Sequence, residues 1–343
     1  MRKRILVVSN NPFYGGGESF LVSTIEPLYK DYELYFIVKN NTLKEKLNTN
    51  TIILKNKNII SNIREVRKLI NKIKPDLTIY NGGSSLYISI FEKGIKLLIR
   101  HSTNKGISNK LSLKLLLHNI LLHLAYFKAN KTIHVSNYSR NEQKFFKDKS
   151  ITIHNGVEID KIEEKSINNL HTPLKLLYVG RVEESKGINI IAETIAQYPP
   201  NIITLDIVGD GTYMEKLKKL KYPNIMLHGF QNNVNSYYDN ADIFITLPTH
   251  ENLPISVLDA MNHSLMTICS NVGGLPEIIE NHKNGIFVNR DIKDLKKAID
   301  FCINHRDLII EYSNQAKIKC VQNFDIRQTI VKYKQVISTL IRK

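Results

Sequence analysis

Short apolar runs recur along the chain, and most are followed by a glycine-containing or polar turn and then by an amphipathic stretch. Alternation of strands and helices predicts a mostly parallel sheet covered by helices, in which ligands bind beyond the carboxyl ends of the strands. In the first half the pattern predicts strands at 5–9, 34–38, 51–54, 77–80, 96–100 and 132–135, and helices at 19–29, 62–73 and 111–127.

The same alternation starts again near residue 174, and a chain of 343 residues is long enough for two domains of about 150 to 170 residues. We therefore expect α/β domains at 1–165 and 171–325, joined by the polar residues 161–173. In the second half the pattern predicts strands at 174–179, 205–208, 225–230, 241–247, 265–269 and 285–288, and helices at 188–198, 254–261, 292–303, 306–322 and 326–341.

Gly15, Gly16 and Gly17 stand between the first strand and the first helix. Glycines let a backbone approach a phosphate, and a helix start supplies partial positive charge. The spacing differs from the G-x-G-x-x-G of dinucleotide-binding folds, which disfavours a dehydrogenase. Taken alone, the triplet is equally consistent with a flexible loop.

Arg181 and Lys186 flank the turn after the predicted strand 174–179, within the sequence GRVEESKG. Two cations beside a helix start can neutralise a diphosphate leaving group without a metal. The chain contains no D-x-D triplet that could hold a divalent ion. We therefore expect neither a metal nor a cofactor, although an isolated pair of this kind could also be solvated loop charges.

Two acids, Glu251 and Asp259, stand eight positions apart around a predicted helix whose first residue is Pro254. Carboxylate oxygens accept strong bonds from hydroxyls, so this pair indicates a polyol such as a sugar or a ribose. Gly273 and Gly274 follow the next strand, where backbone N–H groups can meet an anion. The alternative is a pair of solvated acids beside an ordinary turn.

His101 ends the predicted strand 96–100, where a side chain can point into a ligand crevice. A surface histidine in a loop is the alternative.

The helix 111–127 could face lipid or cover the sheet, but polar residues interrupt it and it is shorter than a bilayer requires. The first ten residues predict a strand and not a secretion signal. Three scattered cysteines indicate neither a disulfide framework nor a zinc site, which favours a reducing cytoplasm.

The positive charge is concentrated in the first half of the chain. Residues 1–150 carry 26 Lys and Arg against 10 Asp and Glu, whereas residues 151–343 carry 22 against 22. A surplus confined to one half indicates a surface that faces something anionic, either phospholipid headgroups or nucleic acid.

Several of these motifs together resemble family 4 glycosyltransferases. The resemblance rests on G-R-x4-K-G at 180–187, the acids Glu251 and Asp259, the glycine pair followed by Glu277, and Asn-Gly-Val at 155–157. The family pairs its acids as E-x7-E, so Asp259 is a departure. The resemblance implies a GT-B fold, in which two Rossmann-like domains face each other across a cleft. It also implies that a terminal helix, 326–343, packs back on the first domain.

The resemblance further implies retaining transfer of a sugar from a nucleoside-diphosphate sugar to an acceptor hydroxyl, without a metal or a cofactor. Arg181 and Lys186 would hold the diphosphate, Glu251 the sugar, Asp259 the ribose, and His101 a sugar hydroxyl. Further donor-binding residues would be Gly15, Gly16, Gly17, Gly180, Asn252, Leu253, Pro254 and Ile255.

The basic first half favours a lipid-linked or cell-envelope glycan acceptor, such as lipopolysaccharide or capsule. It also favours a cytoplasmic enzyme at the inner face of the plasma membrane, in peripheral contact with anionic lipid. Alternatives are a sugar-nucleotide epimerase of the same architecture, a non-catalytic nucleotide-sugar-binding module, and a nucleic-acid-binding protein. No recognition helix or aromatic RNA signature supports the last of these, so no nucleic acid partner is expected.

Overall fold

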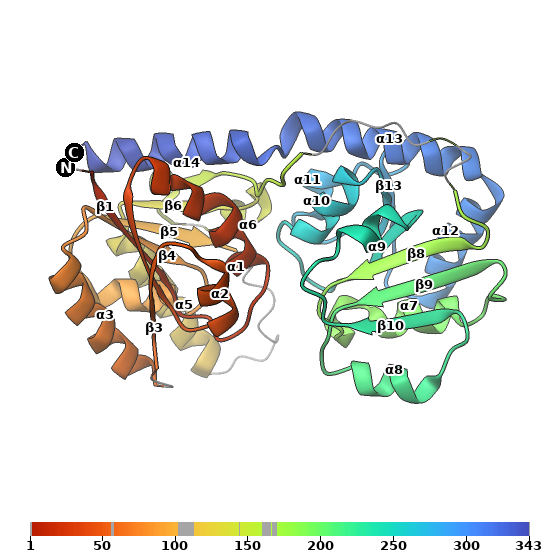
Figure 1. The fold of residues 1–343 in the computed structure, drawn as a ribbon, viewed down its shortest axis with the longest axis horizontal. Helices are drawn as coiled ribbons and strands as arrows, with labels where there is room; N and C mark the ends of the chain where they lie inside the picture. Colours follow the sequence, from red (N-terminus) through yellow and green to blue (C-terminus); the bar gives the residue numbers. More distant parts are fainter. Residues whose placement is uncertain are drawn as a thin grey trace. The chain divides into compact units, whose positions relative to one another are not determined.

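A computed structural model describes residues 2–55, 58–101, 113–143, 145–159, 166 and 170–342. The chain forms two compact units, Met1–Gly156 with Ile326–Lys343 (unit 1) and Val157–Asp325 (unit 2) (Figure 1). The boundary lies at Gly156 and not at the expected residue 165, because the N–H of Val157 already donates to the carbonyl of Phe324 in unit 2, at 2.8 Å. Most of the expected linker lies outside the described residues.

Unit 1 is built on a seven-stranded sheet whose paired strands are all parallel. Its order is β3-β2-β1-β4-β5-β6-β7, so the direction of strand addition reverses between β1 and β4. The apolar runs expected as strands are the buried centres of this sheet, which confirms the α/β class. The strands are β1 (Arg4–Ser9), β2 (Glu33–Val38), β3 (Asn50–Ile53), β4 (Leu77–Asn81), β5 (Lys96–Arg100), β6 (Lys131–His134) and β7 (Ser150–Thr152).

Unit 2 repeats this plan with a six-stranded parallel sheet in the order β10-β9-β8-β11-β12-β13. Here the reversal falls between β8 and β11, which pair directly. Ligands of open parallel sheets bind at such a reversal, beyond the carboxyl ends of the strands. The strands are β8 (Leu174–Val179), β9 (Ile203–Val208), β10 (Ile225–Gly229), β11 (Ile243–Thr246), β12 (Met266–Ser270) and β13 (Gly285–Val288).

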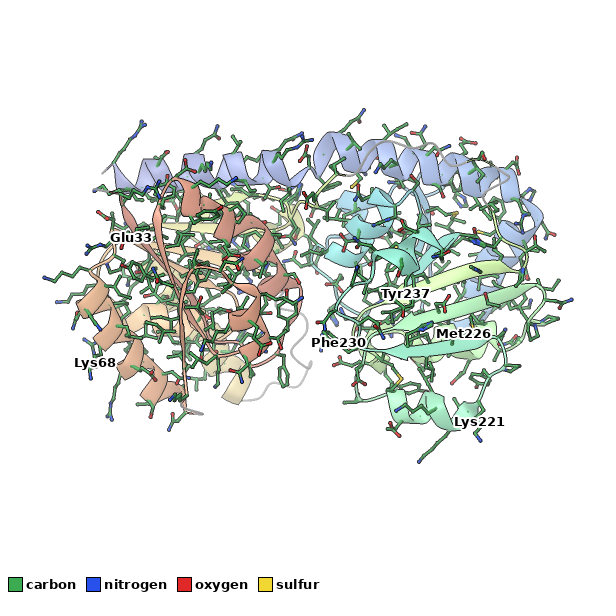
Figure 2. All side chains as sticks on the ribbon, viewed as in Figure 1. Glu33, Lys68, Lys221, Met226, Phe230 and Tyr237 are labelled. Carbon is green, nitrogen blue, oxygen red and sulfur yellow. The ribbon has the colours of Figure 1, made fainter. Side chains whose placement is uncertain are left out.

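Helices cover both sheets, and apolar side chains fill the space between the layers (Figure 2). Within the described residues, none of the helices combines the length and the apolar character needed to cross a bilayer. The helices of unit 1 are α1 (Gly16–Phe20), η1 (Leu21–Ile25), η2 (Glu26–Lys30), α2 (Asn41–Lys46), α3 (Ile59–Ile73), α4 (Ser85–Ile88), η3 (Ser89–Phe91), α5 (Leu113–Lys128), α6 (Asn137–Glu142), η5 (Lys147–Lys149) and α14 (Ile326–Ile341). Those of unit 2 are η7 (Glu184–Lys186), α7 (Ile188–Ile195), α8 (Met214–Leu220), α9 (Asn235–Asp239), α10 (Ile255–Asn262), α11 (Leu275–Ile278), α12 (Ile292–Asn304) and α13 (Arg306–Asn323).

The last helix, α14, is part of unit 1. Its Tyr333 is fully buried, with its ring centre 5.3 Å from that of Phe20. Gly156 permits this packing, because a Cβ atom there would stand 2.6 Å from the Cα of Ile326 and 2.7 Å from the Oγ1 of Thr329. The Asn-Gly-Val segment expected at the domain end therefore includes a close approach of two backbones.

Proline limits two of the helices whose extents differ from the prediction. The helix expected at 19–29 starts at Gly16 and changes from α to π to 3-10 geometry, because Pro27 can donate no N–H to the preceding turn. The helix expected at 188–198 ends at Ile195, ahead of Pro199 and Pro200. The short helices α2, α4, α6, α8 and α9 and the three-residue strand β7 were not predicted, because so few residues do not establish a period.

Candidate active site

The loop after β8 presents the two predicted cations. The phenol of Tyr178, at the end of this strand, donates a hydrogen bond to the carbonyl of Arg181 at 2.6 Å. The Arg181 guanidinium is 65% exposed, and its Nη1 donates to Oε1 of Glu183 at 2.7 Å. The chain then makes the 3-10 turn η7 (Glu184–Lys186), which leads into α7. The backbone is thus fixed while the Arg181 side chain extends into solvent.

Lys186 and Glu251 form an ion pair between the loops that follow β8 and β11. Both side chains are about four-fifths buried. Backbone bonds fasten the loops to each other, since Leu247 N–H donates to the Lys186 carbonyl at 3.2 Å and Thr249 N–H to the Ser185 carbonyl at 2.8 Å. The pair therefore lies where strand addition reverses in the unit 2 sheet.

The pKa of the Tyr178 phenol depends on the charges around it. Burial raises the pKa of its phenol, and the Glu251 carboxylate raises that pKa further, whereas Arg181 lowers it. Arg181 and Glu251 thus both lie within electrostatic range of Tyr178, although Arg181 makes its own ion pair with Glu183 and Lys186 makes its pair with Glu251.

The glycine pair after β12 holds the Glu251 loop in place. Gly274 N–H donates to the Glu251 carbonyl at 3.3 Å. Gly273 has a φ of 61°, and a Cβ atom there would lie 1.7 Å from the same carbonyl oxygen. No other residue type fits at Gly273 without displacing the Glu251 backbone. The predicted anion-binding turn is thus also a support for the catalytic candidate.

The residues after Glu251 enter α10. Asn252 and Leu253 are buried, and the N–H of Asn252 donates to Oε1 of Glu251 at 3.3 Å. Pro254 was expected as the first helical residue, but its ψ of 123° is extended, so it caps the helix and Ile255 is the first residue inside.

Asp259 lies one turn inside α10. The charge of its carboxylate raises the pKa of the Tyr238 phenol on α9 and that of the Cys320 thiol on α13. Burial is the larger cause at both groups. The ion pair of Glu251 is made with Lys186, so the two predicted acids have different neighbours.

Arg290 was not identified from the sequence. Its Nε donates to the Leu247 carbonyl at 2.7 Å and its Nη2 to the Glu184 carbonyl at 3.0 Å. One side chain therefore connects the loop carrying Lys186 with the strand end that leads to Glu251. Arg290 follows a predicted strand, as the identified groups do, but a single arginine at such a position carries no spacing signal.

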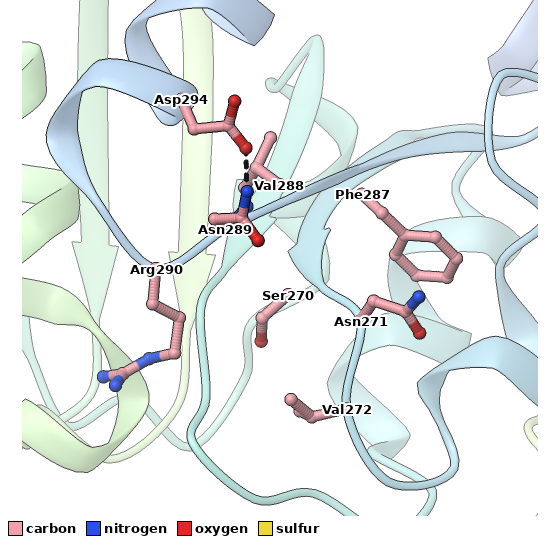
Figure 3. A pocket seen from close by; sticks show the side chains of 8 residues that line it. All are labelled: Ser270, Asn271, Val272, Phe287, Val288, Asn289, Arg290 and Asp294. Atoms are coloured by element: carbon pink, nitrogen blue, oxygen red, sulfur yellow. Dashed lines mark hydrogen bonds between the residues drawn. The ribbon is translucent and has the colours of Figure 1, made fainter.

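Arg290 also lines a pocket of about 270 Å³ at the carboxyl ends of β12 and β13 (Figure 3). Its guanidinium points away from Asp294, whose carboxylate accepts the N–H of Asn289 at 2.7 Å. The pocket is lined by Ser270, Asn271, Val272, Phe287, Val288, Asn289, Arg290 and Asp294. Across the described part of the chain, no three His, Cys, Asp or Glu side chains are gathered so that they could hold a metal ion.

In unit 1, His101 lies beyond the end of β5 and beside the glycine loop. Its Nε2 lies 2.8 Å from Oδ1 of Asn81. The Asn81 amide nitrogen donates to the Gly17 carbonyl at 3.1 Å, which turns the amide oxygen toward the ring. Nε2 is then the protonated nitrogen and Nδ1 carries the lone pair. Burial lowers the pKa of His101 to about 4, so the ring is neutral at pH 7.

The glycine loop approaches this histidine closely. A Cβ atom on Gly17 would lie 3.4 Å from the ring of His101, and Gly16 begins α1. Gly15 is extended and needs no glycine for its backbone angles. Glu18 of α1 was not identified from the sequence; it is buried, and its carboxylate accepts a bond from the Ser9 hydroxyl at 3.3 Å. Burial raises the pKa of Glu18.

Comparisons with known proteins show the fold of this chain. Residues 160–319, all of them in unit 2, match the family model "Glycosyl transferases group 1". The whole chain superposes on the structure of Anabaena HepE in complex with UDP-glucose with a TM-score of 0.83 and 18% identity, covering 98% of this chain and 99% of that one. The chain has a GT-B fold.

Two curated relatives of this GT-B chain act in polysaccharide synthesis. The O-antigen biosynthesis glycosyltransferase WbnH of Escherichia coli is 33% identical over 177 residues, which cover 50% of each chain. The amylovoran biosynthesis glycosyltransferase AmsK of Erwinia amylovora is 31% identical over 146 residues, 38% of this chain and 36% of that one. The chain thus spans half or less of the length of these relatives.

Proposed function

We propose that this protein is a glycosyltransferase that moves a sugar from a nucleoside-diphosphate sugar to an acceptor hydroxyl. The observation that carries the proposal is the Lys186–Glu251 pair at the strand reversal of unit 2, with Arg181 on the same loop. The GT-B fold and the glycosyltransferase match over residues 160–319 support it. Because HepE was solved with UDP-glucose, UDP-sugars are the first donors to test.

In this proposal the two cations of the β8 loop act on the leaving group. The bond between the anomeric carbon and the diphosphate oxygen breaks, and its electron pair stays with the diphosphate. Lys186 and Arg181 neutralise the charge that develops there, which lowers the barrier. Lys186 is held in place by Glu251 before the reaction starts, whereas Arg181 must leave Glu183. The acceptor oxygen forms the new bond to the anomeric carbon, and its proton passes to the diphosphate.

Glu251 has two roles in the proposal. Before the donor binds, its carboxylate holds Lys186 in place. Once the diphosphate takes over the ammonium, the carboxylate is available to accept a bond from a sugar hydroxyl. Asp259 would hold the ribose, as in the family whose motif it modifies. His101, with a pKa of about 4, is a poor base at neutral pH and would bond a sugar hydroxyl as a neutral ring.

We further propose that the enzyme belongs to family 4, retains the anomeric configuration and requires no metal. The motif at 180–187 and the pair Glu251 and Asp259 support the family assignment. The two cations proposed to act on the leaving group support metal independence, because they would supply the charge that a divalent ion otherwise supplies.

The acceptor is proposed to be a lipid-linked precursor of a cell-envelope glycan, made at the cytoplasmic face of the plasma membrane. Relatives named for O-antigen and amylovoran biosynthesis support this class of product. The basic surplus of residues 1–150 supports contact with anionic lipid.

The test is a thermal-shift panel of nucleoside diphosphates and their sugars, followed by a turnover assay with the donor that stabilises the fold most. A donor at 100 times its Kd adds about 2.7 kcal/mol to the free energy of unfolding. The donor is incubated with and without a lipid-linked acceptor. Transfer that requires the acceptor supports the proposal. Consumption of donor into an epimer without acceptor, or binding without product, contradicts it.

A further inference from the structure

The pocket between the ends of β12 and β13 is not used by the proposed transfer chemistry (Figure 3). Its volume of about 270 Å³ is just below the range of about 300 to 1,000 Å³ that is usual for sites of drug-sized ligands. It lies at the carboxyl ends of the strands, the same edge of the unit 2 sheet that carries Glu251. The pocket therefore has room for a single small ring close to the candidate active site.

The protein leaves several hydrogen-bonding groups of this pocket available. Within the part of the chain that the structure describes, the side-chain amides of Asn271 and Asn289 bond to no other protein group, and both residues are exposed. Asp294 uses Oδ2 to accept the N–H of Asn289, at 2.7 Å, and its second carboxylate oxygen has no such bond. A ligand can thus meet two amides, each a donor and an acceptor, and one carboxylate oxygen.

An aromatic ring and an aliphatic side chain complete the lining. Phe287, at the end of β13, is partly exposed, and in Figure 3 it lies with Asn271 on the side of the pocket opposite Arg290. Val272 lies below them in the same view. A sugar ring packs its C–H groups on an aromatic face, while its hydroxyls bond to amides and carboxylates. This mixture of groups suits a sugar.

The charges of the lining favour a ligand without charge. Arg290 is its one cation, and its Nε and Nη2 donate to the carbonyls of Leu247 and Glu184, outside the pocket. Asp294 is the one acid, and it lies in the first turn of α12, where the helix dipole offsets part of its charge. An anion would meet a carboxylate without a cation directed at it. A neutral polyol meets no such penalty.

We propose that this pocket binds one neutral sugar residue of the glycan, close to the residue that takes part in transfer. Only β12 separates β11 from β13, so two strand spacings, about 10 Å, separate the pocket from the strand that leads to Glu251. The ring of Phe287 packs on the sugar, and the amides of Asn271 and Asn289 bond to its hydroxyls. The role of the glycan rests on the proposed function, but binding of a free sugar can be measured without turnover.

The absence of tryptophan from the chain allows a direct test with the full-length protein. Phe287→Trp keeps an aromatic face and places a single fluorescent reporter in the pocket. Its emission is titrated with the methyl glycosides of glucose, galactose, mannose and N-acetylglucosamine. We expect at least one of them to change the emission in a saturable manner. Phe91→Trp, at a 49% exposed position of unit 1, should show no change.

Second substitutions in the Phe287→Trp protein show which groups hold the sugar. Asn271→Ala should raise the Kd of the glycoside by tenfold or more. Asn201→Ala is the matched control, because Asn201 is an exposed asparagine ahead of β9, at the opposite edge of the same sheet, and it should leave the Kd unchanged. Lys186→Ala should also leave it unchanged, since Lys186 does not line the pocket. Melting temperatures confirm that each variant is folded.

Transfer provides a second reading. In the parent background, Asn271→Ala should raise the KM for a glycan acceptor about tenfold, with the donor-induced thermal shift unchanged. If the protein transfers no sugar, the proposed function fails, whereas the fluorescence titration still tests the pocket.

Three results would overturn the inference. The first is a Phe287→Trp emission that none of the four glycosides changes. The second is a Kd that Asn271→Ala leaves as it was, or that Lys186→Ala raises as much, because the sugar would then be bound elsewhere. The third is tighter binding of uridine or of methyl glucuronide than of every neutral glycoside, which would assign the pocket to a nucleobase or to an anion.

Discussion

The ammonium of Lys186 lies against the carboxylate of Glu251, 65 residues further along the chain. The two meet because β8 and β11 pair at the strand reversal and their loops are tied together by backbone hydrogen bonds. In the proposed reaction the diphosphate of the donor competes with Glu251 for Lys186. The charges of this pair can therefore be tested separately for binding and for turnover.

Glu251→Gln should separate binding of the nucleotide from turnover. The amide keeps the shape of the side chain but releases Lys186, so UDP should bind at least as tightly as to the parent. Transfer should fall by about 10² to 10³, because the amide is a weaker acceptor for the sugar hydroxyl in the transition state. Isothermal titration calorimetry and initial rates provide the two readings. Glu183→Gln, which changes the acid bonded to Arg181 and to the Ser185 hydroxyl, is the matched control and should keep most of the activity. Full turnover by Glu251→Gln would remove this residue from the mechanism.

Arg181→Ala should lower the rate of transfer by about 10² to 10³ while the protein stays folded. The side chain is 65% exposed and pairs only at the surface with Glu183, so little stability depends on it. Arg181→Lys should recover part of the lost rate, since it keeps the charge but not the fork of donors. Steady-state kinetics with melting temperatures check this. A rate within tenfold of the parent for the alanine variant would contradict a leaving-group role.

Arg290 is expected to act as a positioning residue. Arg290→Ala removes the bonds to the Glu184 and Leu247 carbonyls, and we expect kcat to fall by about tenfold with less change in KM for the donor. Arg290→Lys can restore only one of the bonds and should rescue part of kcat. Arg306→Ala breaks a similar bond to the His171 carbonyl elsewhere in unit 2 and should affect stability alone. Equal kcat in Arg290→Ala and the parent would show that the loops hold their position without it.

The pH dependence of stability should reveal two imidazoles of unit 1 that are shielded from water, the buried His134 and the partly buried His101. Burial lowers the pKa of His101 and that of His134 to about 4, against 6.5 when exposed. The unfolded chain therefore binds more protons below pH 6.5, and stability is lost as pH falls from 6.5 toward 4. The full loss is about 3 kcal/mol for each ring. Thermal melts of the parent and of His101→Asn check this, and the variant should lose about half of the dependence. A parent protein equally stable at pH 7 and pH 4.5 would contradict it.

Gly156→Ala should destabilise the packing of α14 on unit 1. The added Cβ would meet the Ile326 Cα at 2.6 Å, and backbone on both sides must shift, at a cost of about 1 to 3 kcal/mol. Gly15→Ala is the control, because its Cβ would meet nothing nearer than 3.8 Å. We expect faster proteolysis near Ile326 in the first variant only. Identical melting and proteolysis in both variants would mean that the backbones separate at little cost.

The sequence predicted the repeated α/β plan because long apolar runs in parallel sheets are buried on both faces and are easily recognised. It also indicated Lys186 and Glu251, since both follow such runs. It could not show that they pair with each other, because this depends on β11 lying next to β8. The direction of the Arg181 side chain, toward Glu183, is likewise decided by local contacts that spacing does not encode.

Other features that the sequence did not reveal have equally specific causes. Arg290 was missed because a single arginine after a strand carries no spacing signal, and its importance comes from two carbonyls distant in the chain. Gly273 was identified as a candidate for anion binding, and its φ of 61° and its closeness to the Glu251 carbonyl give it in addition a structural role that only coordinates reveal. The sequence left open whether the helix 111–127 faces lipid or covers the sheet, because its polar residues do not define one polar side. The structure buries Leu122, Ala125 and Tyr126 of α5 in the core of unit 1.

The central claim is that Lys186 and Arg181 neutralise the departing diphosphate without a divalent ion. The most direct test measures transfer by the parent and by Lys186→Ala, each in excess EDTA and in excess Mg²⁺ or Mn²⁺. The account predicts full activity of the parent in EDTA and a loss of about 10² to 10³ in the variant that metal does not restore. Loss of the parent's activity in EDTA, with recovery on adding metal, would contradict it.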